Sequence, residues 1–235
     1  MSCLIDHEAI ATASCGQRKY AHLPGQLAVT IAPEIAYSFT NTGRFVDTYF
    51  GGGGTHITMW TYDGTNLTGV DIPVTFYDAT TPATQQGTSV RPRSSSTLAT
   101  VESINFVQVY EIDPTTETQK GFVSFGTPGQ DYTQPAAVML DSGSVLVSYS
   151  VSSTSLFPSI GAIEVNPDMS LSAQQQVQFG NGVEDEAPGE CANCARYGDF
   201  ASAVLDPNNH QVASVDNEYT TANNQWNTWL NPITG

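Results

Sequence analysis

The chain has 235 residues, of which 13% are charged, and its 23 acidic residues against 7 basic ones give a formal net charge of −16. This balance excludes nucleic acid as a partner, because phosphate binding needs a basic surface, and it disfavours an anionic membrane surface for the same reason. Hydrophobic residues make up 40% of the chain, which excludes wholesale disorder. No apolar run approaches the ~20 residues that a membrane span requires.

Short β-rich runs recur along the chain, and long segments with helical periodicity are almost absent. The expected strands lie at residues 27–32, 35–40, 55–62, 71–77, 104–112, 121–125, 136–140, 145–150, 160–165, 201–205 and 211–215. Turn-forming dipeptides separate them, namely Asp63-Gly64, Asp113-Pro114, Ser142-Gly143, Asn166-Pro167 and Asp206-Pro207. Each dipeptide supplies a preset or positive φ at a tight reversal. The sequence therefore predicts an all-β fold.

One hairpin pattern occurs twice. A small-residue-rich apolar strand ending in Leu140-Asp141 is followed by a turn and a second apolar strand, and the same order returns 65 positions later at Leu205-Asp206. Residues 27–40 resemble a degraded third copy. Apolar strands that are not strictly alternating are typical of the inner strands of a propeller blade, which neighbouring blades cover on both faces.

We therefore expect one β-propeller-like domain over residues 1–235, with about four blades of four antiparallel strands. It is either a short ring or a fragment of a larger propeller. The clearest blades span residues 103–165 and 196–230, and residues 1–24 are a candidate segment for closing the ring. A β-sandwich or a jelly roll is the alternative architecture.

The last part of the chain carries a more specific pattern, in which Arg196-Tyr197-Gly198-Asp199-Phe200 precedes a Val-Leu-Asp-Pro corner, Asn217-Glu218-Tyr219 and Trp226-Asn227-Thr228-Trp229. This pattern resembles the C-terminal blade of exported bacterial β-propeller proteins with an R-[WY]-G-D-[YF] motif, which are distantly similar to the sialidase-like superfamily. The resemblance covers about residues 103–230. It implies a propeller fold and a secreted protein, extracellular or periplasmic. The low lysine content and strong acidity of the chain agree with export.

Arg196 and Asp199 are the first candidates for a site. An arginine that pairs with a carboxylate in two parallel hydrogen bonds can lock a blade junction, or it can hold a ligand carboxylate at the propeller mouth. Trp226 and Trp229 are candidate ligand-binding aromatics, with packing within the blade as the alternative. We expect a recognition or scaffold module that binds a carbohydrate or protein ligand.

The competing class is a glycoside hydrolase or lyase on a propeller scaffold, so the sequence leaves open whether the protein is an enzyme. An active sialidase is disfavoured. That chemistry needs several arginines around a carboxylate and a tyrosine nucleophile with a glutamate partner. The chain has only five arginines, its Arg91-Pro92-Arg93 run does not match the Arg-Ile-Pro signature, and it lacks the Asp-box motif of those enzymes.

The densest acidic stretch contains Glu184, Asp185, Glu186 and Glu190. Calcium is held by six to eight oxygen ligands from carboxylates and carbonyls, so this stretch is a candidate calcium site, with a solvated acidic loop as the alternative. We expect no other cofactor.

Four cysteines lie near the two ends of the chain, namely Cys3, Cys15, Cys191 and Cys194. A Cys-x2-Cys pair could be half of a zinc site, a redox pair or part of a disulfide. Export favours disulfides, and three connectivities remain open. A bridge between the two ends would close the ring.

Overall fold

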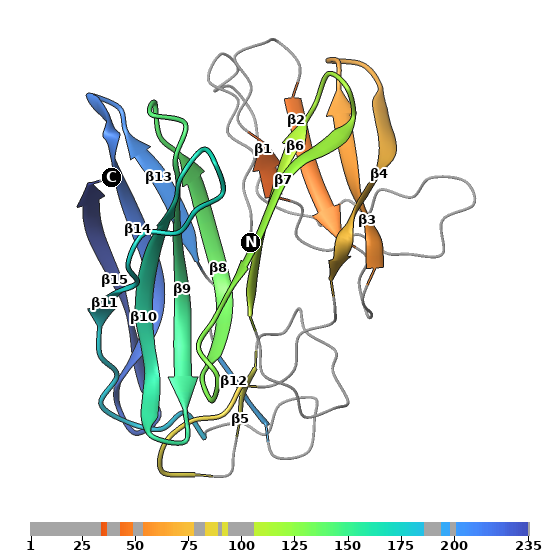
Figure 1. The fold of residues 1–235 in the computed structure, drawn as a ribbon. Helices are drawn as coiled ribbons and strands as arrows, with labels where there is room; N and C mark the ends of the chain where they lie inside the picture. Colours follow the sequence, from red (N-terminus) through yellow and green to blue (C-terminus); the bar gives the residue numbers. More distant parts are fainter. Residues whose placement is uncertain are drawn as a thin grey trace. The chain divides into compact units, whose positions relative to one another are not determined.

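A computed structural model describes residues 34–36, 43–48, 54–77, 83–88, 91–93, 106–185, 194–197 and 201–234 of the chain. Within these residues all regular secondary structure is β-strand, and the sheets are antiparallel apart from one parallel pair. The expected all-β class is confirmed (Figure 1). No helix in this part of the chain has the length and apolarity that a membrane crossing needs.

The chain divides into two compact units, which are described separately below. The first comprises Met1–Asp78 and Glu111–Lys120, and the second comprises Ala79–Tyr110 and Gly121–Gly235. The single propeller over residues 1–235 stays a prediction, and residues 1–24 lie outside the described part of the chain.

The first unit contains a four-stranded sheet in which each strand pairs with the next one along the chain. Its strands are β1 (Glu34–Ala36), β2 (Gly43–Thr48), β3 (Gly54–Tyr62) and β4 (Leu67–Tyr77). The side-chain amide of Gln119 accepts from the backbone N–H of Thr75 and donates to its hydroxyl, at 2.7 and 3.1 Å. Gln119 thereby occupies hydrogen-bonding groups of an edge strand that would otherwise be open to another chain.

The second unit contains a sheet of the same sequential topology, with strand order β11-β10-β9-β8. These strands are β8 (Asp131–Met139), β9 (Val145–Ser153), β10 (Leu156–Val165) and β11 (Gln175–Gln178). Almost every residue of β9 is buried. A strand buried on both faces is what its near-continuous apolar and small-residue sequence predicts. Its partner β8 lies at the edge of the sheet and alternates between buried and exposed residues, so the inner-strand interpretation of the whole hairpin stays a prediction.

A third sheet, β13 (Ser202–Asp206), β14 (Asn209–Ala222) and β15 (Gln225–Thr234), covers one face of this four-stranded sheet (Figure 1). Both hairpins of the sequence repeat are therefore present, as β8–β9 and β13–β14. The small side chains Ala162 and Ala213 lie between the two sheets and let them approach closely. The larger core residues of this interface are Val138, Leu140, Leu146, Val215 and Ile233.

The other face of the four-stranded sheet packs against the hairpin of β6 (Val107–Asp113) and β7 (Thr118–Phe125). The residues of the hairpin that belong to the second unit supply Phe125, which packs with Tyr132 and Tyr149 in an aromatic cluster with ring centroids 4.9–6.3 Å apart. The second unit therefore has three β layers, and its middle sheet is buried on both faces.

The predicted turns are confirmed at all five dipeptides. Asp63, Asp113 and Asp206 each accept a hydrogen bond from a backbone N–H two residues further along, which closes the turn. Gly64 and Gly143 adopt φ values of +93° and +84°, where a side chain would be strained. These hairpins are decided by local chemistry, so the sequence alone reveals them.

Two four-stranded sheets of sequential topology and face-to-face layers agree with propeller blades at the level of the single sheet. Ring closure and the number of blades stay predictions, and so does the choice against a sandwich.

Candidate functional site

The parallel pair at one end of the second unit joins β5 (Arg91–Arg93) to β12 (Cys194–Arg196). The register places Arg93 opposite Arg196 and Arg91 opposite Cys194. Three of the five arginines of the chain thus lie on two paired strands. Sequence reasoning had used Arg91-Pro92-Arg93 only as evidence against a sialidase, because no local pattern links it to residues so far along the chain.

Tyr197 follows β12 directly and is buried. Its hydroxyl donates to the backbone carbonyl of Glu218 at 2.6 Å, and the Ser150 hydroxyl donates to the same carbonyl at 3.4 Å. Burial raises the pKa of Tyr197 well above its ordinary value, and the charges of Glu218 and Glu184 raise it further. Tyr197 is therefore a protonated tyrosine that joins β12 to β14.

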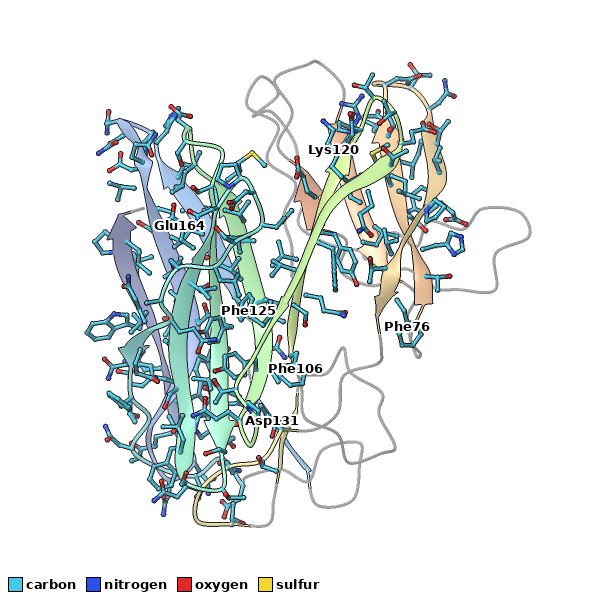
Figure 2. All side chains as sticks on the ribbon, in the orientation of Figure 1. Phe76, Phe106, Lys120, Phe125, Asp131 and Glu164 are labelled. Carbon is cyan, nitrogen blue, oxygen red and sulfur yellow. The ribbon has the colours of Figure 1, made fainter. Side chains whose placement is uncertain are left out.

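Two buried acidic residues, Glu184 and Asp131, also lie in the second unit. Glu184 exchanges two hydrogen bonds with the side chain of Gln85: its backbone N–H donates at 2.9 Å and its carbonyl accepts at 2.7 Å. Asp131 accepts from both the N–H and the hydroxyl of Thr84, at 2.7 and 2.6 Å. Figure 2 shows Asp131 at the opposite end of the sheet from Glu164.

The contacts of Gln85 with Glu184, of Thr84 with Asp131 and of Tyr197 with Glu218 therefore connect segments that are distant in sequence. All of these residues except Thr84 are buried, and hydrogen bonds satisfy the polar atoms named above, as burial requires. These hydrogen bonds hold the distant segments of the second unit together. A tyrosine nucleophile would need a lowered pKa, whereas the pKa of Tyr197 is raised.

The predicted calcium stretch is described only in part. Glu184 is buried, while Asp185 is exposed and its backbone N–H donates to the side-chain carbonyl of Asn224 at 2.7 Å. Glu186 and Glu190 lie outside the described residues. Within the described ranges, no group of three or more metal-ligating side chains gathers. Calcium binding stays a prediction.

Trp226 and Trp229 both lie on β15 but face in opposite directions. Trp226 pairs with Thr220 and Trp229 with Asn217, and residues three apart on a strand lie on opposite faces. Trp229 shares its face with Ile233, which is buried against the neighbouring sheet. The two indole rings cannot form one platform, although sequence reasoning had placed them together at a propeller mouth. Their spacing within one strand was the signal that would have separated them.

Trp229 is 39% exposed and lies edge-to-face against the buried Tyr219, with ring centroids 6.3 Å apart at 86°. Such a contact orients a half-exposed ring. Trp226, 55% exposed, belongs to the other face.

The remaining candidates fall mainly outside the described residues. Asp199, Cys3, Cys15 and Cys191 are not described, whereas Arg196 and Cys194 are placed through the backbone of β12. The carboxylate partner of Arg196 and the disulfide connectivity therefore stay predictions.

No protein-family model matches the sequence, and no curated protein matches it. Among solved structures, the chain is similar to the crystal structure of the GH43 BlXynB protein from Bacillus licheniformis, with a TM-score of 0.42 and 13% sequence identity. The match covers 87% of this chain and 40% of that one. A similarity this low gives no information about the ligand or the activity of this chain.

Proposed function

We propose that this chain is an exported recognition module of β-propeller type that binds a neutral carbohydrate at Trp229 on β15. The half-exposed indole of Trp229, held by Tyr219, carries the proposal. Carbohydrate sites combine a flat apolar ring, which covers the C–H face of a sugar, with a few polar groups that fix its orientation.

The surroundings of Trp229 support a sugar ligand. On β15, Asn227 is exposed and lies on the same face as Trp229. An amide can donate to and accept from sugar hydroxyls. The formal charge of −16 disfavours acidic polysaccharides through long-range repulsion. A neutral glycan therefore fits this edge of the sheet better than a polyanion does.

The alternative, a propeller-type glycoside hydrolase or lyase, rests on the buried carboxylates Glu184 and Glu218 beside Tyr197. It is the weaker proposal, because Tyr197 is held protonated and Glu184 makes structural hydrogen bonds through its backbone. A hydrolase would release reducing ends from a glycan that the protein binds, whereas a recognition module would leave that glycan intact.

The test is isothermal titration calorimetry with four neutral hexasaccharides, each built from glucose, xylose, mannose or galactose units alone. We expect one of the four to bind. Trp229→Ala is expected to weaken that binding about tenfold, which corresponds to losing about 1.4 kcal/mol of stacking free energy. Trp226→Ala is the matched control, because Trp226 is an exposed tryptophan on the opposite face of the same strand. Equal losses in both variants, or no binding of any of the four hexasaccharides, would contradict the proposal.

A further inference from the structure

One face of the third sheet is buried against the neighbouring sheet, whereas the opposite face is buried at Glu218 and Thr220 and carries exposed residues elsewhere. Its inner face contributes Ala203, Leu205, Ala213, Val215 and Ile233 to the core. The residues between them on each strand point the other way. On this outer face the register forms two adjacent rows, Val204–Ser214–Pro232 and Ser202–Asp216–Leu230.

Beside Asp216, this outer face has exposed apolar residues at its margins. Leu230 is 68% exposed and Val204 is 47% exposed, on either side of β14. Pro232 is also exposed and lies next to Leu230 on the same face. Exposed apolar residues that share one face mark a candidate interaction surface, whereas single ones are ordinary.

Asp216 occupies the centre of the outer face. Its Oδ1 atom is buried and accepts no hydrogen bond. A carboxylate oxygen that has lost water without gaining a donor is costly, and the cost is recovered when a donor arrives, above all a charged one. The outer-face residues in the two rows include no basic side chain that could supply that donor.

These observations also narrow the class of partner. A second copy of this chain would bring a further formal charge of −16 and would offer no cation from the same face. A surface that offers one cation among apolar side chains complements both the centre and the margins of this face.

We propose that the outer face of β13–β14–β15 docks a partner protein whose contact surface carries an arginine or a lysine among apolar side chains, with the cation bound by Asp216. This surface lies on the face of β15 opposite Trp229, so it goes beyond the proposed carbohydrate site and does not depend on it. Leu230 and Val204 contact the apolar side chains that surround the cation.

The probe is a disulfide-cyclised β-hairpin peptide with Leu, Arg and Val on one face and Thr on the other, compared with the same peptide carrying Glu in place of Arg. Fluorescence anisotropy of labelled peptides against the intact chain measures both affinities. We expect the Arg peptide to bind at least tenfold more tightly, which corresponds to about 1.4 kcal/mol. Asp216→Asn is expected to remove most of that difference, and Leu230→Thr to weaken the Arg peptide several-fold.

Two controls separate this surface from others. Phe179→Thr removes an aromatic side chain that is 59% exposed outside this sheet, and Trp229→Ala removes the proposed glycan contact; both are expected to bind the Arg peptide normally. Circular dichroism melts verify that each variant folds. Equal affinity for the Arg and Glu peptides, an Asp216→Asn variant that retains the difference, or no binding up to about 1 mM would overturn the proposal. A dimer in light scattering that Leu230→Thr dissociates would overturn it too, because the face would then be covered by a second copy.

Discussion

The backbone N–H of Asp141 donates to the carbonyl oxygen of His210 at 3.3 Å, and the Asp141 carboxylate lies 3.3 Å from Nδ1 of the same histidine. Asp141 belongs to the turn of the β8–β9 hairpin, and His210 lies at the start of β14 in the β13–β14 hairpin. These are the two hairpins that repeat in the sequence. The turn of one repeat is therefore bonded directly to the other repeat in the adjacent sheet.

The side-chain part of this contact is expected to be weak, because both side chains are largely exposed. A double-mutant cycle with Asp141→Ala and His210→Ala is expected to give a coupling of about 0.2–1 kcal/mol that shrinks in 1 M salt. The backbone hydrogen bond persists in all variants, so each single variant folds normally. A coupling above about 2 kcal/mol would mean that the side-chain contact itself holds the hairpins together.

Gly161 is predicted to tolerate no side chain. It pairs with Tyr149 across β9 and β10, and a Cβ at this position would lie 2.5 Å from a carbon of the buried tyrosine ring. Gly161→Ala is expected to destabilise the fold by about 1–3 kcal/mol through overpacking, measured by urea unfolding. Adding Tyr149→Leu creates room and is expected to reduce the penalty of the glycine substitution. A fully additive double variant would contradict this explanation.

Tyr197→Phe is expected to cost about 1–3 kcal/mol, because it removes a buried donor from the carbonyl of Glu218. Tyr62→Phe is the matched control. Its hydroxyl also donates to a backbone carbonyl, that of Gly64 at 2.8 Å, but at an exposed position. The control is expected to change stability by less than about 0.5 kcal/mol. Similar losses in the two variants would refute a special role for the buried bond.

Stability is expected to fall in alkali. Burial raises the pKa values of Tyr197 and Tyr149 above the ordinary value of 10.0. Their contribution is fully present below pH 10 and is lost as the pH rises above it, because the unfolded chain then releases protons that the folded chain retains. Denaturant midpoints at pH 8–12 measure this loss, and Tyr197→Phe is expected to flatten the decline. A wild-type curve that is flat to pH 12 would contradict the burial of both hydroxyls.

Asp113 is expected to support the β6–β7 turn in its ionised form. The backbone N–H of Thr115, the Lys120 ammonium and the N–H of Thr116 lower its pKa from 3.8 to about 2. Its contribution is therefore present above pH 3.8 and is lost as the pH falls toward 2. Asp113→Asn keeps an acceptor for the two N–H groups and is expected to melt above Asp113→Ala. An Asp113→Asn variant that melts no higher than Asp113→Ala would contradict the role of these two hydrogen bonds in the turn.

The sequence predicted the parts of the fold that depend on neighbours along the chain. Asp63-Gly64 and Asp113-Pro114 specify their turns through hydrogen bonds that close within two or three residues. The apolar and small residues of β9 indicated a strand buried on both faces, and its burial agrees. The repeat identified two hairpins, and both form.

The candidate site was less accessible to such reasoning. The backbone pairing of Arg196 with Arg93 was not foreseen, because no local pattern signals a parallel pairing between segments so far apart; the carboxylate expected beside the Arg196 side chain stays a prediction. Glu184 was assigned to a solvated or calcium-binding loop, whereas its backbone is bonded to the side chain of Gln85 and it is buried. Both relationships join segments about a hundred positions apart, so they depend on packing.

The amino-acid sequence by itself determined the all-β class, the hairpins and their turns, because backbone propensity and turn hydrogen bonds act over a few residues. The tertiary structure alone decided which face of a strand is covered. It placed Trp229 and Trp226 on opposite faces of β15, buried Tyr197 against Glu218, and left Val204 and Leu230 exposed on the face that also carries Asp216. Burial depends on the sheets that stack against each strand, and their stacking is a property of contacts that are remote in sequence.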